Sequence, residues 1–552
     1  MFFDPEPFNM GLAAIQWLLT LCICCGIALA VVVVLSLSVS GVSGPANVWR
    51  AVIRGVRDIV DMSPKRIGAV ASLTLKESLR RQDVLVGVVF VLLFMFAGWF
   101  LSSANVDTPA KPYISFVLTA IRWLILPVAL LLSCWGLPAD IKARSLHTVV
   151  TKPARRSEVV LGRMLGYSSL MTVGVAIMGL VGYVWITRQV PESAQHQLIS
   201  RVPQYGQLTY LDRTGAPSFS GINVGDMWDY RSFVEGNTKA AAIFTFKDLN
   251  TNRLSQDDQL QLEYRFEVFR THKGDIEKAV QAQFTLVNEQ SGLRVPYPRV
   301  PFEVKEFADM QARSAEDDGR LPIITIPREL TYTPEGELSS KTVDLFEDVI
   351  HDGTLTVQVR CVDQGQYLGA ARTDLFVRLP DKTFAVGYFK AIWGTWMMAI
   401  LVIVLGTTAS TFVKGPVATL LTFAMVLTGL TLRPFMSGVL EQYQQTGVVQ
   451  GGGMLESAYR MVTQMNTQVE LPGGFLTEAI QWIDDRMLQG LLLLQNVIPD
   501  FTHFDMTPYV ANGFDVPWNN AMMPSIATTL AFILPALILG YFCLQWRELE
   551  AK

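Results

Sequence analysis

Seven long, almost entirely apolar stretches dominate this 552-residue sequence and restrict what it can fold into. A helix needs about 20 consecutive apolar residues to cross the roughly 30 Å hydrocarbon core of a bilayer. Only 17% of the residues are charged, against about 25% in soluble chains. The sequence therefore predicts a polytopic α-helical membrane protein with spans at Gly11–Val39, Val84–Ser103, Ser115–Leu137, Val159–Ile186, Ala385–Val413, Pro416–Leu432 and Ser525–Leu544.

The first apolar stretch begins about ten residues into the chain, where a secretory signal peptide could also lie. Signal peptides open with positive charge. Residues 1–10 contain Asp4 and Glu6 but no Lys or Arg. We therefore interpret residues 1–40 as a transmembrane anchor that stays in the protein.

Basic residues in the loops predict the orientation, because cytoplasmic loops of membrane proteins are rich in Lys and Arg. They gather after the first, third, fifth and seventh stretches, which alternate crossing places on one side. That side is predicted to be the cytoplasm, with the N-terminus outside a cell (inner) membrane and the C-terminus inside. The residues are Arg50, Arg54, Arg57, Lys65, Arg66, Lys76, Arg80, Arg81, Lys142, Arg144, Lys152, Arg155, Arg156, Lys414, Arg547 and Lys552.

Residues 188–384 contain no span and fall on the predicted outside. Between Leu260 and Val268 apolar and polar residues alternate, which is typical of a half-buried strand. The pattern recurs at Val280–Leu286, Leu355–Cys361 and Leu375–Leu379. We expect a turn at Asp363–Gln366 between the last two strands and a Pro-rich connection at Arg294–Pro301. The segment predicts an extracytoplasmic β-sandwich-like domain of antiparallel sheets.

A second outside region, residues 436–524, separates the last two spans. Leu455–Met465 and Phe475–Leu494 have amphipathic patterns, and Trp482 and Trp518 are side chains that favour membrane interfaces. We expect two interfacial helices here.

The cytoplasmic loop of residues 138–160 joins the third and fourth stretches. Ile141–Val150 has the pattern of a short amphipathic helix, which Pro153 would end. Ser157 and Glu158 are suited to start the next helix. The loop is thus predicted to be a compact basic element, held by two membrane helices, on which a partner protein can push.

This loop resembles the one in permeases of the ABC-2 type, the membrane subunits of ATP-driven exporters. The matching residues are Asp140, Thr151–Pro153, Arg155 or Arg156, and Val160–Arg163. Arg144-Ser145 replaces the usual Gly-Thr of the family, and Arg163 replaces its usual Lys. The resemblance implies an ATPase-coupling set of Asp140, Arg144, Ser145, Thr148, Pro153, Arg155, Arg156, Gly162 and Arg163.

Two further segments resemble the same family. Ala71–Arg81 looks like the amphipathic elbow helix that precedes the first core span, and Val497–Phe501 with Phe504-Asp505 looks like the approach to the last span. The family then implies a six-span core in residues 84–187, 385–435 and 525–552, after a linker and elbow in residues 41–83. The N-terminal span and the β domain would be additions to that core.

The chain contains no Gly-x-x-x-x-Gly-Lys-Ser/Thr phosphate-binding loop. The resemblance therefore implies a permease without its own ATPase, coupled to a separate ABC ATPase subunit that binds the ATP. It also implies a second permease copy or homologue in the bilayer. The alternatives are a non-transporting receptor or scaffold that displays the β domain, and a membrane-embedded enzyme acting on lipid or glycan.

Other residues give few chemical signals. Arg122, inside the third stretch, either lies on the substrate path or extends to the outer interface. Gly162 and Gly166 have the spacing that allows close helix packing. The histidines show no metal-ligand spacing, no nucleophile has a neighbouring base, and no cofactor or enzyme activity is expected. The net charge of −4 argues against a nucleic-acid partner.

Overall fold

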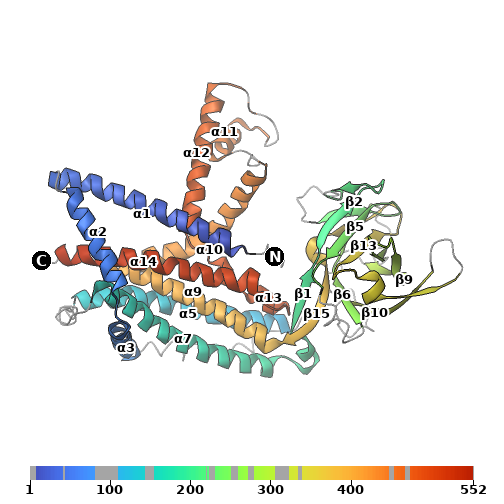
Figure 1. Ribbon diagram of the computed structural model, residues 1–552, viewed down its shortest axis with the longest axis horizontal. Coiled ribbons are helices and arrows are strands. Elements are labelled where there is room, and N and C mark those ends of the chain that lie inside the picture. The colour runs from blue at the N-terminus through green and yellow to red at the C-terminus, as the bar shows by residue number, and fades with distance from the viewer. Residues whose placement is uncertain are drawn as a thin grey trace.

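The computed structural model has a bundle of long helices at one end and a β domain at the other (Figure 1). Its described residues are 8–41, 44–80, 110–142, 155–218, 220–222, 231–249, 259–271, 279–304, 323–333, 339–446, 453–466, 471 and 473–550.

Six helices of this described part are long and apolar enough to cross a membrane. They confirm six of the seven predicted stretches as helices, whereas the predicted span Val84–Ser103 lies outside the described residues. The six helices are α1 (Met10–Ser40), α5 (Ala110–Lys142), α7 (Arg156–Gln189), α9 (Phe384–Phe412), α10 (Gly415–Thr446) and α14 (Met523–Glu550).

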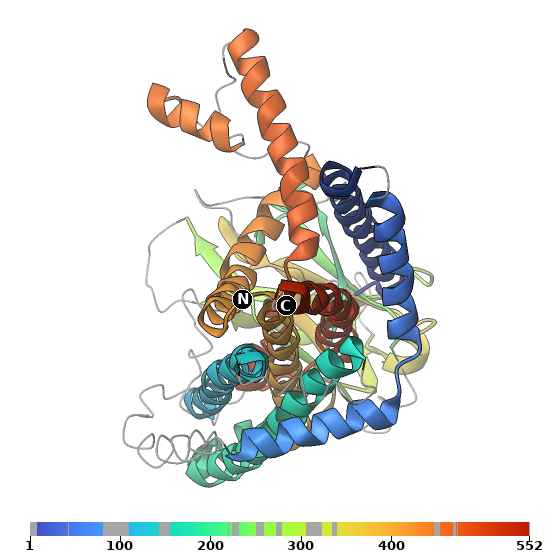
Figure 2. The ribbon, with the colours of Figure 1, turned by 90° about the vertical axis from the view of Figure 1, so that its left-hand side faces the viewer.

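The β domain identifies one end of the bundle, here called the domain end. Helix α7 leads through the short helix η2 (Glu192–Gln197) into the domain, and its last strand continues directly into α9 (Figure 1). Helices α2 (Gly44–Val60) and α3 (Pro64–Arg80) lie across the opposite end, here called the α2–α3 end (Figure 2). Both helices are amphipathic, as expected for elements at a membrane surface.

Two more helices, α11 (Met454–Thr463) and α12 (Phe475–Val497), project sideways from the bundle (Figures 1 and 2). They confirm the two helices predicted between the last spans. Helix α10 continues to Thr446, well past the predicted end of the span at Leu432, because Arg433 and Pro434 interrupt the apolar pattern but not the helix.

The β domain contains two larger antiparallel sheets. One is four-stranded, in the order β1 (Ile199–Tyr205), β15 (Leu375–Thr383), β6 (Gln259–Tyr264) and β10 (Ile323–Pro327). The other is six-stranded, in the order β3 (Pro217–Ser218), β2 (Gln207–Leu211), β5 (Ala241–Phe246), β13 (Leu355–Cys361), β8 (Val280–Val287) and β9 (Arg294–Val304).

Two smaller sheets complete the domain: β4 (Ser232–Glu235), β14 (Gln366–Ala370) and β7 (Glu267–Arg270) form one, and β11 (Glu329–Tyr332) and β12 (Lys341–Asp344) the other. The short helices η4 (Leu345–Val349) and η5 (Arg372–Asp374) join strands.

Buried side chains of both larger sheets belong to one hydrophobic cluster, as a sandwich requires. Phe244, Phe284 and Val357 come from the six-stranded sheet, and Leu262 and Val377 from the four-stranded sheet.

Three details of the strand prediction were wrong. Arg294–Pro301 is not a connection but part of β9, which among the described strands pairs with β8 alone, and prolines are tolerated at such an edge position. The run Leu260–Val268 is broken at Arg265, whose N–H donates to the Asp374 carbonyl, so β6 and β7 join different sheets. The turn at Asp363–Gln366 leads into β14, which the prediction omitted.

Candidate functional site

Helices α3 and α7 meet at the α2–α3 end through small residues. A Cβ added to Gly162 would lie 2.6 Å from the Cβ of Val70, and one added to Gly166 would lie 2.6 Å from the Cβ of Thr74. Only glycine at these positions allows the two backbones to approach this closely. The pair at Gly162 and Gly166 therefore packs as its spacing allowed.

A buried carboxylate links the start of α7 to the connection between α2 and α3. Glu158 accepts hydrogen bonds from the backbone N–H of Ser63 (2.8 Å), from the Arg66 guanidinium (2.8 and 3.0 Å) and from the Arg155 N–H (2.9 Å). Its side chain has no exposed surface. Several donors on one carboxylate satisfy it fully, which makes the contact both strong and directional.

Arg155 connects α7 to α2. Its guanidinium donates to the carbonyl oxygen of Arg57 (3.0 Å) and lies 3.3 Å from the Asp61 carboxylate and 3.6 Å from that of Asp58. The hydroxyl of Tyr541, near the end of α14, donates to Asp58 at 2.8 Å. The α2–α3 layer is therefore fixed to both α7 and α14.

The predicted coupling residues fall into two groups. Asp140 lies in the last turns of α5, while Arg144, Ser145, Thr148 and Pro153 lie outside the described residues, as does most of the predicted helix Ile141–Val150. Arg155, Arg156, Gly162 and Arg163 lie at the start of α7. Arg163 pairs with Glu77 of α3 at 3.0 Å. Arg155, Gly162 and Arg163 thus contact α2 and α3, and the coupling role of the set stays a prediction.

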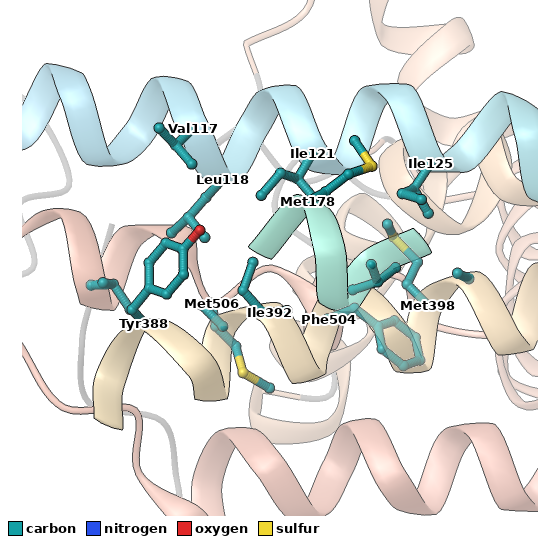
Figure 3. Close-up of a cluster of buried hydrophobic side chains, with 14 of the residues drawn as sticks. Val117, Leu118, Ile121, Ile125, Met178, Tyr388, Ile392, Met398, Phe504 and Met506 are labelled. Atoms are coloured by element: carbon teal, nitrogen blue, oxygen red, sulfur yellow. The ribbon is translucent and has the colours of Figure 1, made fainter. Parts of the chain in front are cut away.

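At the domain end, the chain before α14 enters the bundle. Phe501, Phe504 and Met506 are 0–1% exposed, and Figure 3 shows Phe504 and Met506 among side chains of α5, α7 and α9. Gly429 of α10 makes room, since a Cβ there would lie 2.4 Å from the Pro499 carbonyl oxygen. We call residues 499–506, which include the short helix η6 (Thr502–Phe504), the wedge.

Two aspartates of the wedge lie near two arginines of the bundle. Arg122 of α5 lies 2.8 Å from Asp505, and these side chains are 16% and 25% exposed. Arg433 of α10 lies 3.8 Å from Asp500, and these are 17% and 13% exposed. Both arginines are thus largely shielded from solvent. Arg122, predicted to lie on a substrate path, forms an ion pair with a carboxylate of the same chain.

The segment after the wedge fixes the β domain to the bundle. Past helix α13 (Thr507–Ala511), Asp515 accepts hydrogen bonds from Lys382 of β15 (2.8 Å) and Lys390 of α9 (2.7 Å). Arg201 of β1 donates to the carbonyl oxygen of Gly513 and pairs with Glu263. Residues 513–515 thus add to the free edge of β1 and join the domain to the chain entering α14.

Among the described residues, no group of three or more His, Cys, Asp or Glu side chains is placed to hold a metal ion. Comparison of the chain with known protein families, curated proteins and solved structures gives no match.

Sequence reasoning missed the wedge charges and Arg433. It placed Arg433 just after a span, although the helix continues to Thr446. The Phe-rich approach to the last span was noticed, yet a pattern of aromatic residues does not reveal which arginines its aspartates meet. Basic residues near the ends of predicted spans, matched with acids in the following loop, are the available signal.

Proposed function

We propose that this chain is the membrane-spanning permease subunit of an ABC-2 type, ATP-driven transporter, working as an exporter with a separate ATPase subunit. The observation that carries the proposal is the assembly at the α2–α3 end. There Glu158, Gly162 and Arg163 bind the elbow-like helix α3 to the start of α7. Helix α7 begins at this same end, and in the sequence the coupling-like loop lies between α5 and α7.

Helix α7 offers a direct route for mechanical coupling. It contains 34 residues, which at 1.5 Å per residue makes it about 51 Å long. It begins at the loop and ends next to the β domain. A push by an ATPase on the loop would therefore displace a rigid element that reaches the opposite side, as in other rigid-body transitions.

Charge supports placing the α2–α3 end in the cytoplasm. This end carries the exposed Arg50, Arg54 and Arg57 of α2, in agreement with the positive-inside rule. In this orientation the β domain and the wedge face the outside of a cell (inner) membrane. Two such chains, or one chain and a homologue, would enclose the transport path between them.

Co-purification tests the proposal. The tagged full chain is expressed in its native host, solubilised in mild detergent, and its partners are identified by mass spectrometry. We expect a protein with a P-loop ATPase sequence. The double variant Arg144→Glu, Lys152→Glu reverses charge on the loop and should lose that partner.

The matched control is Arg50→Glu, Arg54→Glu, which makes the same charge change at the same end of the bundle on exposed positions of α2. Arg155 is unsuitable, since its reversal would break the contact with α2. The ATPase should remain with the control. If no nucleotide-binding protein is found in several mild detergents, the proposal is wrong, and a receptor or scaffold displaying the β domain becomes the better description.

A further inference from the structure

The guanidinium of Arg433 is short of hydrogen-bond partners in a place where that is costly. Its Nε and Nη1 atoms are buried and have no hydrogen-bond partner among the described residues. The nearest carboxylate oxygen, Oδ2 of Asp500, is 3.8 Å from Nε, too far for a hydrogen bond. A buried charged donor without an acceptor is strongly disfavoured, so native proteins rarely retain one without a reason.

Asp500 is committed elsewhere. Its Oδ1 accepts hydrogen bonds from the backbone N–H and the hydroxyl of Thr502, at 2.9 and 2.6 Å. Its Oδ2 lies 3.7 Å from Nε2 of His503, again beyond hydrogen-bonding distance. The carboxylate is therefore held by its own turn beside Arg433 and balances the charge without satisfying the donors.

A second arginine forms an ion pair with the same short segment. Arg122 of α5 pairs with Asp505, five residues after Asp500. Two guanidinium groups from different helices thus meet two carboxylates on the wedge. The aromatic side chains Phe501 and Phe504 anchor the wedge in the apolar core, so the carboxylates are held at the bundle and are not free in solvent.

The two arginines lie at matching depth. Arg433 is 18 residues after Gly415, the start of α10, or about 27 Å along the axis. Arg122 is 17 residues before Ala139, where the apolar part of α5 ends, or about 26 Å. With a hydrocarbon core of about 30 Å, both fall near the boundary at the domain end, which is the level of lipid headgroups.

We propose that Arg433 and Arg122 form a binding site for a phosphate group, whose place is partly taken by the carboxylates of the wedge. A guanidinium presents its donors as a planar fork that fits phosphate oxygens, and a phosphate monoester carries up to two negative charges, as the two aspartates do. The phosphate comes either from the headgroup of a lipid in that leaflet or from a free anion. The site does not depend on an ATPase partner.

Binding to the purified full chain in phosphate-free detergent solution tests the site. The probes are dioctanoyl phosphatidic acid, inorganic phosphate and, as the uncharged control, dioctanoylglycerol. We expect saturable binding of phosphatidic acid, of inorganic phosphate or of both, and none of dioctanoylglycerol. Binding of phosphatidic acid alone identifies a lipid headgroup as the ligand, and binding of inorganic phosphate identifies the free anion.

Variants assign the binding to the two arginines. Arg433→Gln and Arg122→Gln should each weaken it at least about tenfold, and Arg433→Lys should weaken it less, because the charge remains but the fork is lost. Asp505→Asn should strengthen it, since Arg122 loses its competing carboxylate. Arg213→Gln, in an exposed pair with Glu235 on the β domain, should change nothing.

Two results would overturn the inference. One is the absence of saturable binding of either phosphate probe to a monodisperse, cooperatively unfolding protein, which would leave water to satisfy Arg433. The other is binding that Arg433→Gln and Arg122→Gln leave intact. Arg433→Lys guards against misfolding, because it keeps the charge pairing with Asp500.

Discussion

Arg122 of α5 and Asp505 of the wedge form an ion pair with 2.8 Å between Nη1 and Oδ2, both side chains largely shielded from solvent. The pair ties the segment before α14 to a helix nearly 400 positions earlier in the chain. Because each partner neutralises the other in a place with little water, loss of either leaves an uncompensated charge.

We expect Arg122→Gln and Asp505→Asn each to lower the stability of the detergent-solubilised protein, and the double variant to lose less than the sum. The coupling energy should be about 1 kcal/mol or more, as for a shielded charge-assisted pair. A double-mutant cycle from chemical unfolding measures it. Strict additivity would show that the two side chains do not interact.

The contact between α3 and α7 predicts an asymmetric response to alanine. Gly162→Ala should destabilise the protein by about 1–3 kcal/mol, because its Cβ would lie 2.6 Å from that of Val70. Gly68→Ala on α3 is the matched control, since no described atom would lie within 4 Å of its Cβ. That change should be neutral or stabilise by up to about 1 kcal/mol. Equal effects of both changes in thermal unfolding would contradict the close packing.

Asp515 is predicted to hold the β domain against the bundle. It is 7% exposed and is shared by Lys382 and Lys390. Asp515→Asn should cost about 3 kcal/mol, because Lys390 would remain shielded without a carboxylate. Hydrogen exchange in β1 should then accelerate, since the Arg201 N–H donates to Gly513 two residues away from Asp515. Arg213→Gln, at an exposed position of the β domain, is the control. Unchanged exchange in β1 of the Asp515→Asn variant would show that Asp515 does not hold the β domain against the bundle.

Cys361 should resist thiol reagents in the folded protein. Burial raises the pKa of its thiol to about 12, and the side chain is 3% exposed. The reactive thiolate is therefore scarce at both pH 8 and pH 9, so labelling of the folded protein should stay slow at either pH, although the thiolate fraction rises about tenfold between them. Maleimide labelling of a variant with Cys361 as its sole cysteine, before and after denaturation, measures this. Rapid labelling of the folded protein would show that the six-stranded sheet is open at β13.

The sequence predicted those features that depend on local pattern. Apolar length identified the long helices, and alternation identified β8 and β13 closely. The local pattern did not predict features that depend on which strands pair. Strand β9 contains prolines that only an edge position tolerates, and the pattern of one strand does not reveal whether it lies at an edge. The break between β6 and β7 likewise depends on a backbone contact with Asp374, more than 100 residues away.

The same limit applies to the candidate site. The loop resemblance pointed to Arg155, Gly162 and Arg163 as a set, yet their partners Asp61, Val70 and Glu77 became visible only in three dimensions. Arg122 stood out as a charge within an apolar stretch. Its pairing with Asp505 depends on how the wedge enters the bundle, which is a property of tertiary packing.

Site-specific photocrosslinking tests the central claim most directly. A photoreactive amino acid replaces Ser145 in the coupling-like loop and, as the control, Lys239, which is exposed on the β domain. Irradiation of living cells is followed by purification and mass spectrometry. A permease predicts that a P-loop ATPase is captured from position 145 and not from position 239. Failure to capture one from position 145, or equal capture from both positions, would contradict the proposed function.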